Sequence, residues 1–397
     1  MKTKSCLLRL TEHECSLFSV KSKILGTNKS ELFRNGAFHY WGSHKEPDFG
    51  GLLKLYQEGS DEDKAVLVDI LFEYYRLTGY PHHNLSNEEL KQKMRTLAVT
   101  KDPLLEDDHL QSNTTGIELA NHFHPHMAEV RCLTNNRSAY DQYIDDDLLK
   151  DAINRWMELD KKPNPSGLRR ILRTRDGVRS VVNFKPAIAK YFYENYCSSG
   201  DRILDPCMGY GGRLAGCIAS NKGIFYHGID VDSRSCIGNV RLAGFYNDLI
   251  NNDIEKNREW LFKFKMDMGC AEDVMRTLPD NAYELIFSSP PFFLVEKYSL
   301  DPAQSYLRYP EYDLWRDKFL FTLVRESFRL CKRGGHLILN LKDYKKYPIA
   351  SDACRCAKNI GFELVKTYHQ RMSNSEYNRR ENQIKYHTEP IFVWLKD

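Results

Sequence analysis

The chain has 397 residues, with 57 lysines and arginines, 54 aspartates and glutamates, and a formal net charge of +3 at pH 7. This length favours two domains over one compact core. Because the net charge is close to zero, a role in nucleic-acid binding would have to rest on local clusters of cations. The sequence has no run of about eighteen apolar residues and no secretory signal pattern at its start, so we expect a cytoplasmic protein, or a nuclear one if the source is eukaryotic.

Cysteine and histidine usage favours a reduced protein without a metal. The eleven cysteines are scattered and form no Cys-x-x-Cys pair, which is typical of free thiols in a reducing compartment. The stretch "HFHPHM" holds three histidines, but no second cluster of ligands follows at a suitable spacing. We therefore expect no metal site.

The first part of the chain is expected to be mainly helical. Residues 60–80 have an amphipathic pattern that begins at Ser60 and ends at Gly79, and residues 145–160 show a second such pattern with acids in the first turn. The segment "KKPNPSG", residues 161–167, then reads as a linker. We expect an N-terminal helical domain over residues 1–165, without a chemical motif, and a second domain over residues 166–397.

The second part alternates apolar strands with helical patterns. This alternation predicts an α/β fold with a mostly parallel sheet and helices on both faces. The expected strands are residues 201–206, 223–232, 282–289 and 334–343, followed by a closing hairpin that ends at residues 390–396.

A glycine-rich turn follows the first of these strands, in "LDPCMGYGGRLAG", residues 204–216. Gly209 and Gly211 allow a tight turn and a close approach of backbone N–H groups to a ligand. Asp205 precedes this turn, and Asp230 ends the next strand, where an acid can bind ribose hydroxyls. The turn matches neither the Walker pattern nor G-x-G-x-x-G, so the sequence favours a nucleoside ligand held by its ribose and by backbone groups.

The stretch "IFSSPPFFLVEKY", residues 286–298, ends a strand with two prolines, which cannot continue a central strand. A rigid turn of this kind directs carbonyl groups, and with the Ser289 hydroxyl they could accept hydrogen bonds from an amino group. Phe292 could stack on a planar ring that carries this group. The alternative is a strand-ending turn that is simply packed by aromatic side chains.

Taken in order, "LDPCMGYGGR", "GIDVD" and "SSPPFF" resemble the cofactor loop, the ribose acid and the catalytic motif of class I S-adenosylmethionine-dependent methyltransferases. They are most similar to the DNA amino-methyltransferases, which modify adenine N6 or cytosine N4, and the resemblance covers roughly residues 168–397. It implies a Rossmann-like seven-stranded sheet and S-adenosyl-L-methionine as cofactor. It also implies methyl transfer to the exocyclic amine of a base that is flipped out of double-stranded DNA.

The resemblance also assigns roles to matching positions. Gly212 and Arg213 stand where those enzymes more often have threonines, and Cys270 stands where an acid often contacts the cofactor's adenine, so that Asp273 is the candidate for that contact. The remaining cofactor positions are Phe184, Lys185 and Pro186 beside the cofactor, Asp205, Pro206, Gly209 and Gly211 around its methionine part, and Asp230 at its ribose. The positions that would hold the target base are Ser289, Pro290, Pro291 and Phe292.

Two groups of arginines suit contacts to phosphates, although each could instead be a solvated charged face. They are Arg169, Arg170, Arg173, Arg175 and Arg179 in "RRILRTRDGVR", and Arg379 and Arg380 in "NRRENQIKYH".

The expected partner is DNA, at the nucleoid in a bacterial cell, with a second copy of the chain or a companion restriction component as further candidates. Target recognition is expected from the N-terminal domain, the 294–312 loop or a partner, and we favour the first. Cytosine N4 and adenine N6 remain open. The alternatives are an RNA or protein methyltransferase on the same fold, and a non-catalytic nucleic-acid-binding protein.

Overall fold

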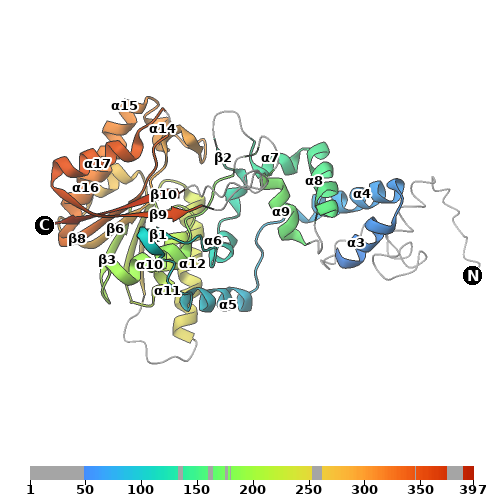
Figure 1. The fold of residues 1–397 in the computed structure, drawn as a ribbon, viewed down its shortest axis with the longest axis horizontal. Coiled ribbons are helices and arrows are strands. Elements are labelled where there is room, and N and C mark those ends of the chain that lie inside the picture. The colour runs from blue at the N-terminus through green and yellow to red at the C-terminus, as the bar shows by residue number, and fades with distance from the viewer. Residues whose placement is uncertain are drawn as a thin grey trace, which may run out of the picture. The chain divides into compact units, whose positions relative to one another are not determined.

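A computed structural model describes residues 49–132, 137–159, 164–174, 178, 180–252, 262–344, 346–372 and 388–397. Its internal contacts divide the chain into two compact units, residues 1–82 with 135–180 and residues 83–134 with 181–397 (Figure 1). Among the described residues, no helix combines the length and the apolar character needed to cross a membrane.

This division differs from a single boundary at residue 165, because residues 83–134 belong with the second unit. Strand β1 (His109–Leu110) lies parallel to β9 (Phe362–Arg371) in the large sheet. The Tyr246 hydroxyl donates a hydrogen bond to the carbonyl of Leu90, at 2.9 Å. These contacts join residues far apart in the chain, which is why the linker-like composition at 161–167 did not reveal them.

The first unit is helical in its described residues and has its own core. Its helices are α3 (Phe49–Glu58), α4 (Asp61–Thr78), α7 (Ala139–Ile144), α8 (Asp146–Leu159) and α9 (Pro165–Thr174). Helix α4 begins with a capping box, in which the Ser60 hydroxyl accepts from the Asp63 N–H and the Asp63 carboxylate accepts from the Ser60 N–H. The two predicted helices at 60–80 and 145–160 are thereby confirmed as α4 and α8.

The second unit is built on an eight-stranded sheet, ordered β1-β9-β10-β8-β6-β3-β4-β5. Only β10 runs antiparallel to its neighbours β8 and β9 in this sheet. The predicted mostly parallel α/β sheet and its closing hairpin are confirmed, with β1 as an eighth strand at the edge instead of the seven expected. The other strands of this sheet are β3 (Arg202–Asp205), β4 (Phe225–Asp230), β5 (Lys263–Met268), β6 (Tyr283–Ser288), β8 (Cys331–Asn340) and β10 (Thr388–Lys396).

Helices cover both faces of this sheet, as Figure 1 shows. Successive strand residues alternate between two apolar clusters: Ile203 and Leu285 belong to one, and Leu204 and Ile286 belong to the other. The helices of this unit are α5 (Asn87–Ala98), α6 (Ile117–His122), α10 (Pro186–Tyr196), α11 (Gly212–Ser220), α12 (Ser233–Asn252), α13 (Ala271–Val274), α14 (Ser305–Arg308), α15 (Tyr312–Trp315), α16 (Phe321–Leu330) and α17 (Ile349–Ile360).

The strand order reverses between β3 and β6. From β3 the chain proceeds to β4 and β5 on one side, and then to β6 and β8 on the other. In open sheets of this kind, ligands bind beyond the carboxyl ends of the strands at the point of reversal. The expected ligand site is therefore formed by the segments that follow Asp205 and Ser288.

Candidate functional site

The glycine-rich turn and the Ser-Ser-Pro-Pro segment meet at this point of reversal. Strands β3 and β6 are neighbours, and they end at Asp205 and Ser288. The Ser288 hydroxyl donates to Asp205 Oδ1 at 2.8 Å and accepts from the Cys207 N–H at 3.2 Å. The two segments singled out in the sequence are therefore hydrogen-bonded to each other.

Asp205 holds this junction together. Its side chain is fully buried. Arg213 Nε donates to its Oδ2 at 2.7 Å, and the Tyr226 hydroxyl donates to the same oxygen at 2.6 Å. With Ser288 on the other oxygen, both oxygens of the carboxylate are engaged within the protein, and these bonds stabilise the turn.

Arg213 is a site residue whose role the sequence did not reveal. The neighbouring carboxylate of Asp205 raises the pKa of its guanidinium, against the opposing effect of burial. The guanidinium also donates to the Cys207 carbonyl. Arg213 thus neutralises the buried Asp205 and stabilises the turn through the Cys207 carbonyl. No rule of local spacing predicts this ion pair.

Asp230 is placed differently from Asp205. It is half-buried at the end of β4, and its two oxygens accept from the N–H groups of Gly209, at 2.8 Å, and Asp232, at 2.9 Å. Burial raises the pKa of this carboxyl to about 6, against the lowering effect of the two N–H groups. A carboxylate oxygen has more than one lone pair, so Asp230 can still accept from hydroxyl groups of a ligand.

The turn itself requires glycine at two places. Gly211 has φ of 74°, in the left-handed region that disfavours other residues. A Cβ atom on Gly212 would lie 2.1 Å from the carbonyl oxygen of Phe184. The backbone of the turn therefore packs directly against the segment that precedes α10.

That segment holds three predicted cofactor positions. The Phe184 ring is half-buried and lies 5.4 Å from the Arg213 guanidinium, measured to the ring centroid. Lys185 is buried, and its amino group donates to Ser112 Oγ at 2.9 Å and to the Arg371 carbonyl at 3.1 Å. Pro186 begins α10. The backbone thus lies beside the turn, but the Lys185 amino group is used in packing, and burial lowers its pKa.

The two serines before the prolines have different environments. Ser288 is fully buried and serves the junction with Asp205, whereas Ser289 is half-buried. The Ser289 hydroxyl lies 3.4 Å from Asn340 Oδ1, at the end of β8. The Asn340 amide in turn donates to the Pro390 carbonyl at 3.1 Å. Asn340 is a second neighbour of the site that sequence reasoning did not select.

The two phenylalanines belong to the same apolar cluster but have different neighbours. Phe293 is 1% exposed, and it has φ of 55°, an uncommon value for a bulky residue. Its ring packs 5.4 Å from the Trp315 ring and 5.0 Å from the Tyr347 ring. Phe292 is 8% exposed, and its ring lies 5.9 Å from that of Tyr344. Both rings are thus part of the core, Phe293 fully buried against Trp315 and Tyr347, and Phe292 beside Tyr344.

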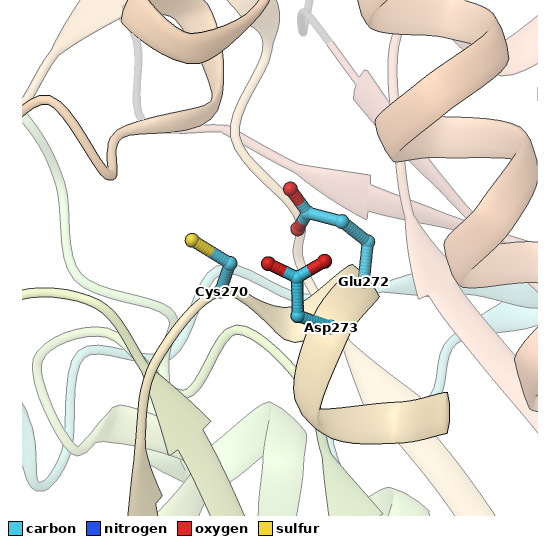
Figure 2. Close-up of side chains that lie close together, drawn as sticks. All are labelled: Cys270, Glu272 and Asp273. Carbon is cyan, nitrogen blue, oxygen red and sulfur yellow. The ribbon is translucent and has the colours of Figure 1, made fainter. Parts of the chain in front are cut away.

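Cys270, Glu272 and Asp273 lie close together at the turn after β5, where Figure 2 shows their side chains. Their ligand atoms lie within 4.8 Å of one another. Arg308 Nη1 donates to Glu272 Oε1 at 2.8 Å and to Asp273 Oδ2 at 2.5 Å. A guanidinium therefore already pairs with both acids, and the group is better described as an ion-pair cluster than as a cation site. The N–H of Gly269 donates to the Asp230 carbonyl at 2.9 Å, which places this turn, with Asp273, next to the end of β4.

The predicted phosphate contacts are only partly within the described residues. Arg169 is buried, and it donates to the Pro81 carbonyl and to Ser166 Oγ, both at 2.8 Å, so it serves the packing of the first unit. Arg170 is exposed and Arg173 is half-buried on α9. The other four, Arg175, Arg179, Arg379 and Arg380, lie outside the described residues.

No protein-family model matches the chain. The chain is 22% identical over 138 residues to the type II beta methyltransferase M.BslI of Bacillus sp. (strain NEB-606), an overlap of 31% of this chain and 14% of that protein. The chain thus spans a small part of the length of this relative.

Solved structures of low similarity were also found. The crystal structure of TrmN from Thermus thermophilus has a TM-score of 0.32 and 16% identity, over 53% of this chain and 49% of that one. Aeropyrum pernix fibrillarin, solved with natively bound S-adenosyl-L-methionine, has a TM-score of 0.30 and 11% identity, over 50% of this chain and 67% of that one. Similarity at this level does not assign a function, so the functional argument rests on the site.

Proposed function

We propose that the second unit is an S-adenosyl-L-methionine-dependent methyltransferase that acts on the exocyclic amine of cytosine (N4) or adenine (N6) in double-stranded DNA. The observation that supports this most is the hydrogen bond between Ser288 and Asp205. It joins the turn suited to a nucleoside to the segment suited to an amine, so a donor and an acceptor of a methyl group would lie side by side. The name of the methyltransferase relative agrees with this proposal.

The cofactor side would be formed by the glycine turn and Asp230. S-adenosyl-L-methionine would supply a methyl group on a sulfonium, which is the electrophile. The half-buried Asp230 carboxylate would accept from the ribose hydroxyls. Asp273, in the turn region after β5, would be the acid that contacts the adenine. Pro206, buried directly after Asp205, would help to fix the wall of the turn.

The target side would be formed by Ser289, Pro290, Pro291 and Phe292. The Ser289 hydroxyl and the Pro290 carbonyl would accept the two N–H groups of the amine, which favours a more pyramidal nitrogen with an available lone pair. Most of the rate enhancement would then come from positioning and from fixed dipoles. In a duplex the base must leave the stack at a cost of a few kcal/mol, which stacking on Phe292 would partly offset.

The test is methyl transfer by the purified full-length chain with methyl-labelled cofactor. Double-stranded DNA lacking prior methylation, total RNA and a protein mixture would be offered separately, and the products digested to nucleosides or amino acids for mass spectrometry. The expected result is label in DNA as N4-methylcytosine or N6-methyladenine. Label in RNA or protein alone would contradict the DNA assignment, and cofactor binding without transfer to any substrate would favour a non-catalytic binding protein.

A further inference from the structure

A half-buried carboxyl lies directly downstream of the predicted catalytic motif. Glu296 begins β7 (Glu296–Lys297), which pairs antiparallel with β2 (Arg131–Cys132), so that Glu296 faces Cys132. The Tyr298 hydroxyl donates to Glu296 Oε2, which fixes the orientation of the carboxylate.

Tyr298 connects this carboxyl to the glycine turn. Its ring lies 6.2 Å from the ring of Tyr210, which belongs to that turn. Tyr298 and Tyr210 also pack in one apolar cluster with Cys132. Glu296 is therefore linked through Tyr298 to the turn assigned to the cofactor, and in the chain it follows Phe292, the phenylalanine assigned to the base, by four residues.

A second carboxyl shares these surroundings. Glu389 precedes Pro390, whose carbonyl accepts from Asn340, the neighbour of Ser289. Burial raises the pKa of Tyr344, whose ring lies 5.9 Å from that of Phe292, and the charges of Glu389 and Glu296 raise it further, so both acids act on this ring.

The two carboxyls differ in their neighbours. Burial raises the pKa of Glu389, and the charges of Lys342 and Lys185 partly offset this effect, so the charge of Glu389 is partly balanced by cations. Burial raises the pKa of Glu296 to about 6, the Tyr298 hydroxyl lowers it, and the charge of Glu389 raises it. In the described part of the chain, further titratable groups near Glu296 are Tyr210, Tyr344 and Cys132.

Methylation of an exocyclic amine requires a proton acceptor. The N–CH₃ bond forms with the nitrogen lone pair while the S–CH₃ bond breaks and its electrons stay on sulfur. The nitrogen then carries a positive charge and must lose one of its two original protons. A serine hydroxyl and a peptide carbonyl are poor bases near neutral pH, whereas a carboxylate in this place is a suitable one.

We propose that Glu296, oriented by Tyr298, accepts the proton that the target amine loses. This inference rests on the proposed function. Glu296 becomes a neutral carboxylic acid in the step, the methylated amine becomes neutral, and the proton later passes to solvent.

The test is single-turnover methyl transfer to DNA at saturating cofactor, from pH 5 to 8. The wild-type rate is expected to rise with pH and to level off above a midpoint near 6. Glu296→Gln keeps an acceptor for Tyr298 but cannot take a proton, so we expect a loss of about 10²-fold at pH 7.5 and no rise with pH. Tyr298→Phe removes a hydrogen bond that favours the ionised carboxyl, so its midpoint should move to higher pH.

Glu389→Gln is the matched control, and it should keep the rise with pH. Cofactor affinity of Glu296→Gln should equal that of the wild type, and its thermal stability at pH 7.5 should not be lower, because ionisation of a carboxyl with a raised pKa lowers stability. A wild-type rate and pH profile in Glu296→Gln would overturn the inference, as would loss of the rise in Glu389→Gln alone, or a rate loss that only follows weaker cofactor binding. Absence of methyl transfer by the wild type itself would instead refute the proposed function, and the inference with it.

Discussion

Two aspartates at the ends of adjacent strands carry different tasks because their partners differ. Asp205 is paired with Arg213 and fully buried, so its charge is neutralised inside the protein. The Asp230 carboxylate accepts only backbone N–H groups among the hydrogen bonds described for it, and burial raises its pKa to about 6. A paired buried acid stabilises the turn, whereas a partly exposed acid without a cation suits ligand hydroxyls.

Asp230→Asn should weaken cofactor binding. A charge-assisted hydrogen bond contributes about 1.5–3 kcal/mol, so we expect the dissociation constant to rise by about 10- to 100-fold at pH 7.5. In the wild type, affinity should fall as the pH drops through about 6, because protonation removes the charge of the acceptor. Calorimetric titration from pH 5 to 8 measures both effects.

The same residue should affect stability with the opposite pH trend. Because its folded pKa lies above the ordinary value of 3.8, ionisation of Asp230 lowers the free energy of unfolding as the pH rises from about 4 to about 6. Asp230→Asn should lose this slope. The control is Asp61→Asn, which changes an exposed carboxylate of the first unit. If Asp230→Asn left the affinity for the cofactor unchanged, the ribose would have to bind at another place.

At the scale of elements, the position of the turn depends on the close packing of α10 against α11. A Cβ atom on Gly216 of α11 would lie 2.6 Å from the Pro186 carbonyl oxygen and 2.7 Å from Ala189 Cβ. These helices flank the glycine turn, so their spacing determines where Gly212 and Phe184 meet.

Gly216→Ala should therefore destabilise the protein, by about 1–3 kcal/mol as is typical of overpacking. The matched control is Gly244→Ala on α12, where a Cβ atom would meet nothing within 4 Å. That substitution should leave stability unchanged or raise it by about 0.5–1 kcal/mol, because alanine is the better helix former. Urea denaturation of both variants measures the difference, and equal stabilities would contradict the packing argument.

At the scale of the whole molecule, a sheet unit that carries the site is accompanied by a helical unit without a chemical motif. Arg170 and Arg173 lie on α9 of the helical unit, and they remain the described candidates for phosphate contacts. If they contact DNA, each should release about one counterion on binding.

Replacing both by alanine should weaken DNA binding and reduce the slope of log affinity against log salt by about 1.8. The control replaces Lys263 and Lys358 by alanine, two exposed cations at the amino end of β5 and in the last turn of α17. Fluorescence anisotropy between about 50 and 200 mM salt gives both slopes. A smaller slope in the control pair, with the wild-type slope in the arginine pair, would assign DNA contacts to the sheet unit.

The pattern of elements was predictable from the sequence because it depends on near neighbours in the chain. The helix expected at 60–80 is α4, Asp61–Thr78, and the strand expected at 282–289 is β6, Tyr283–Ser288. Hydrophobic periodicity and the capping residue Ser60 act over a few residues, and proline and glycine act on their own backbone. The glycine turn and the Ser-Pro-Pro-Phe segment were visible for the same reason.

The partners of the site residues were decided only by the tertiary structure. Asp205 accepts hydrogen bonds from Tyr226 and Ser288, and Lys185 donates one to the Arg371 carbonyl. Residues 83–134 belong to the sheet unit. Each of these contacts joins segments distant in the chain, and no local propensity encodes it. The sequence by itself determined which segments can approach a nucleoside and an amine, because glycine, proline and strand ends are local properties. The fold alone decided that these segments meet, that Arg213 neutralises Asp205, and that Glu296 lies beside them, because burial and charge pairing depend on what packs around each group.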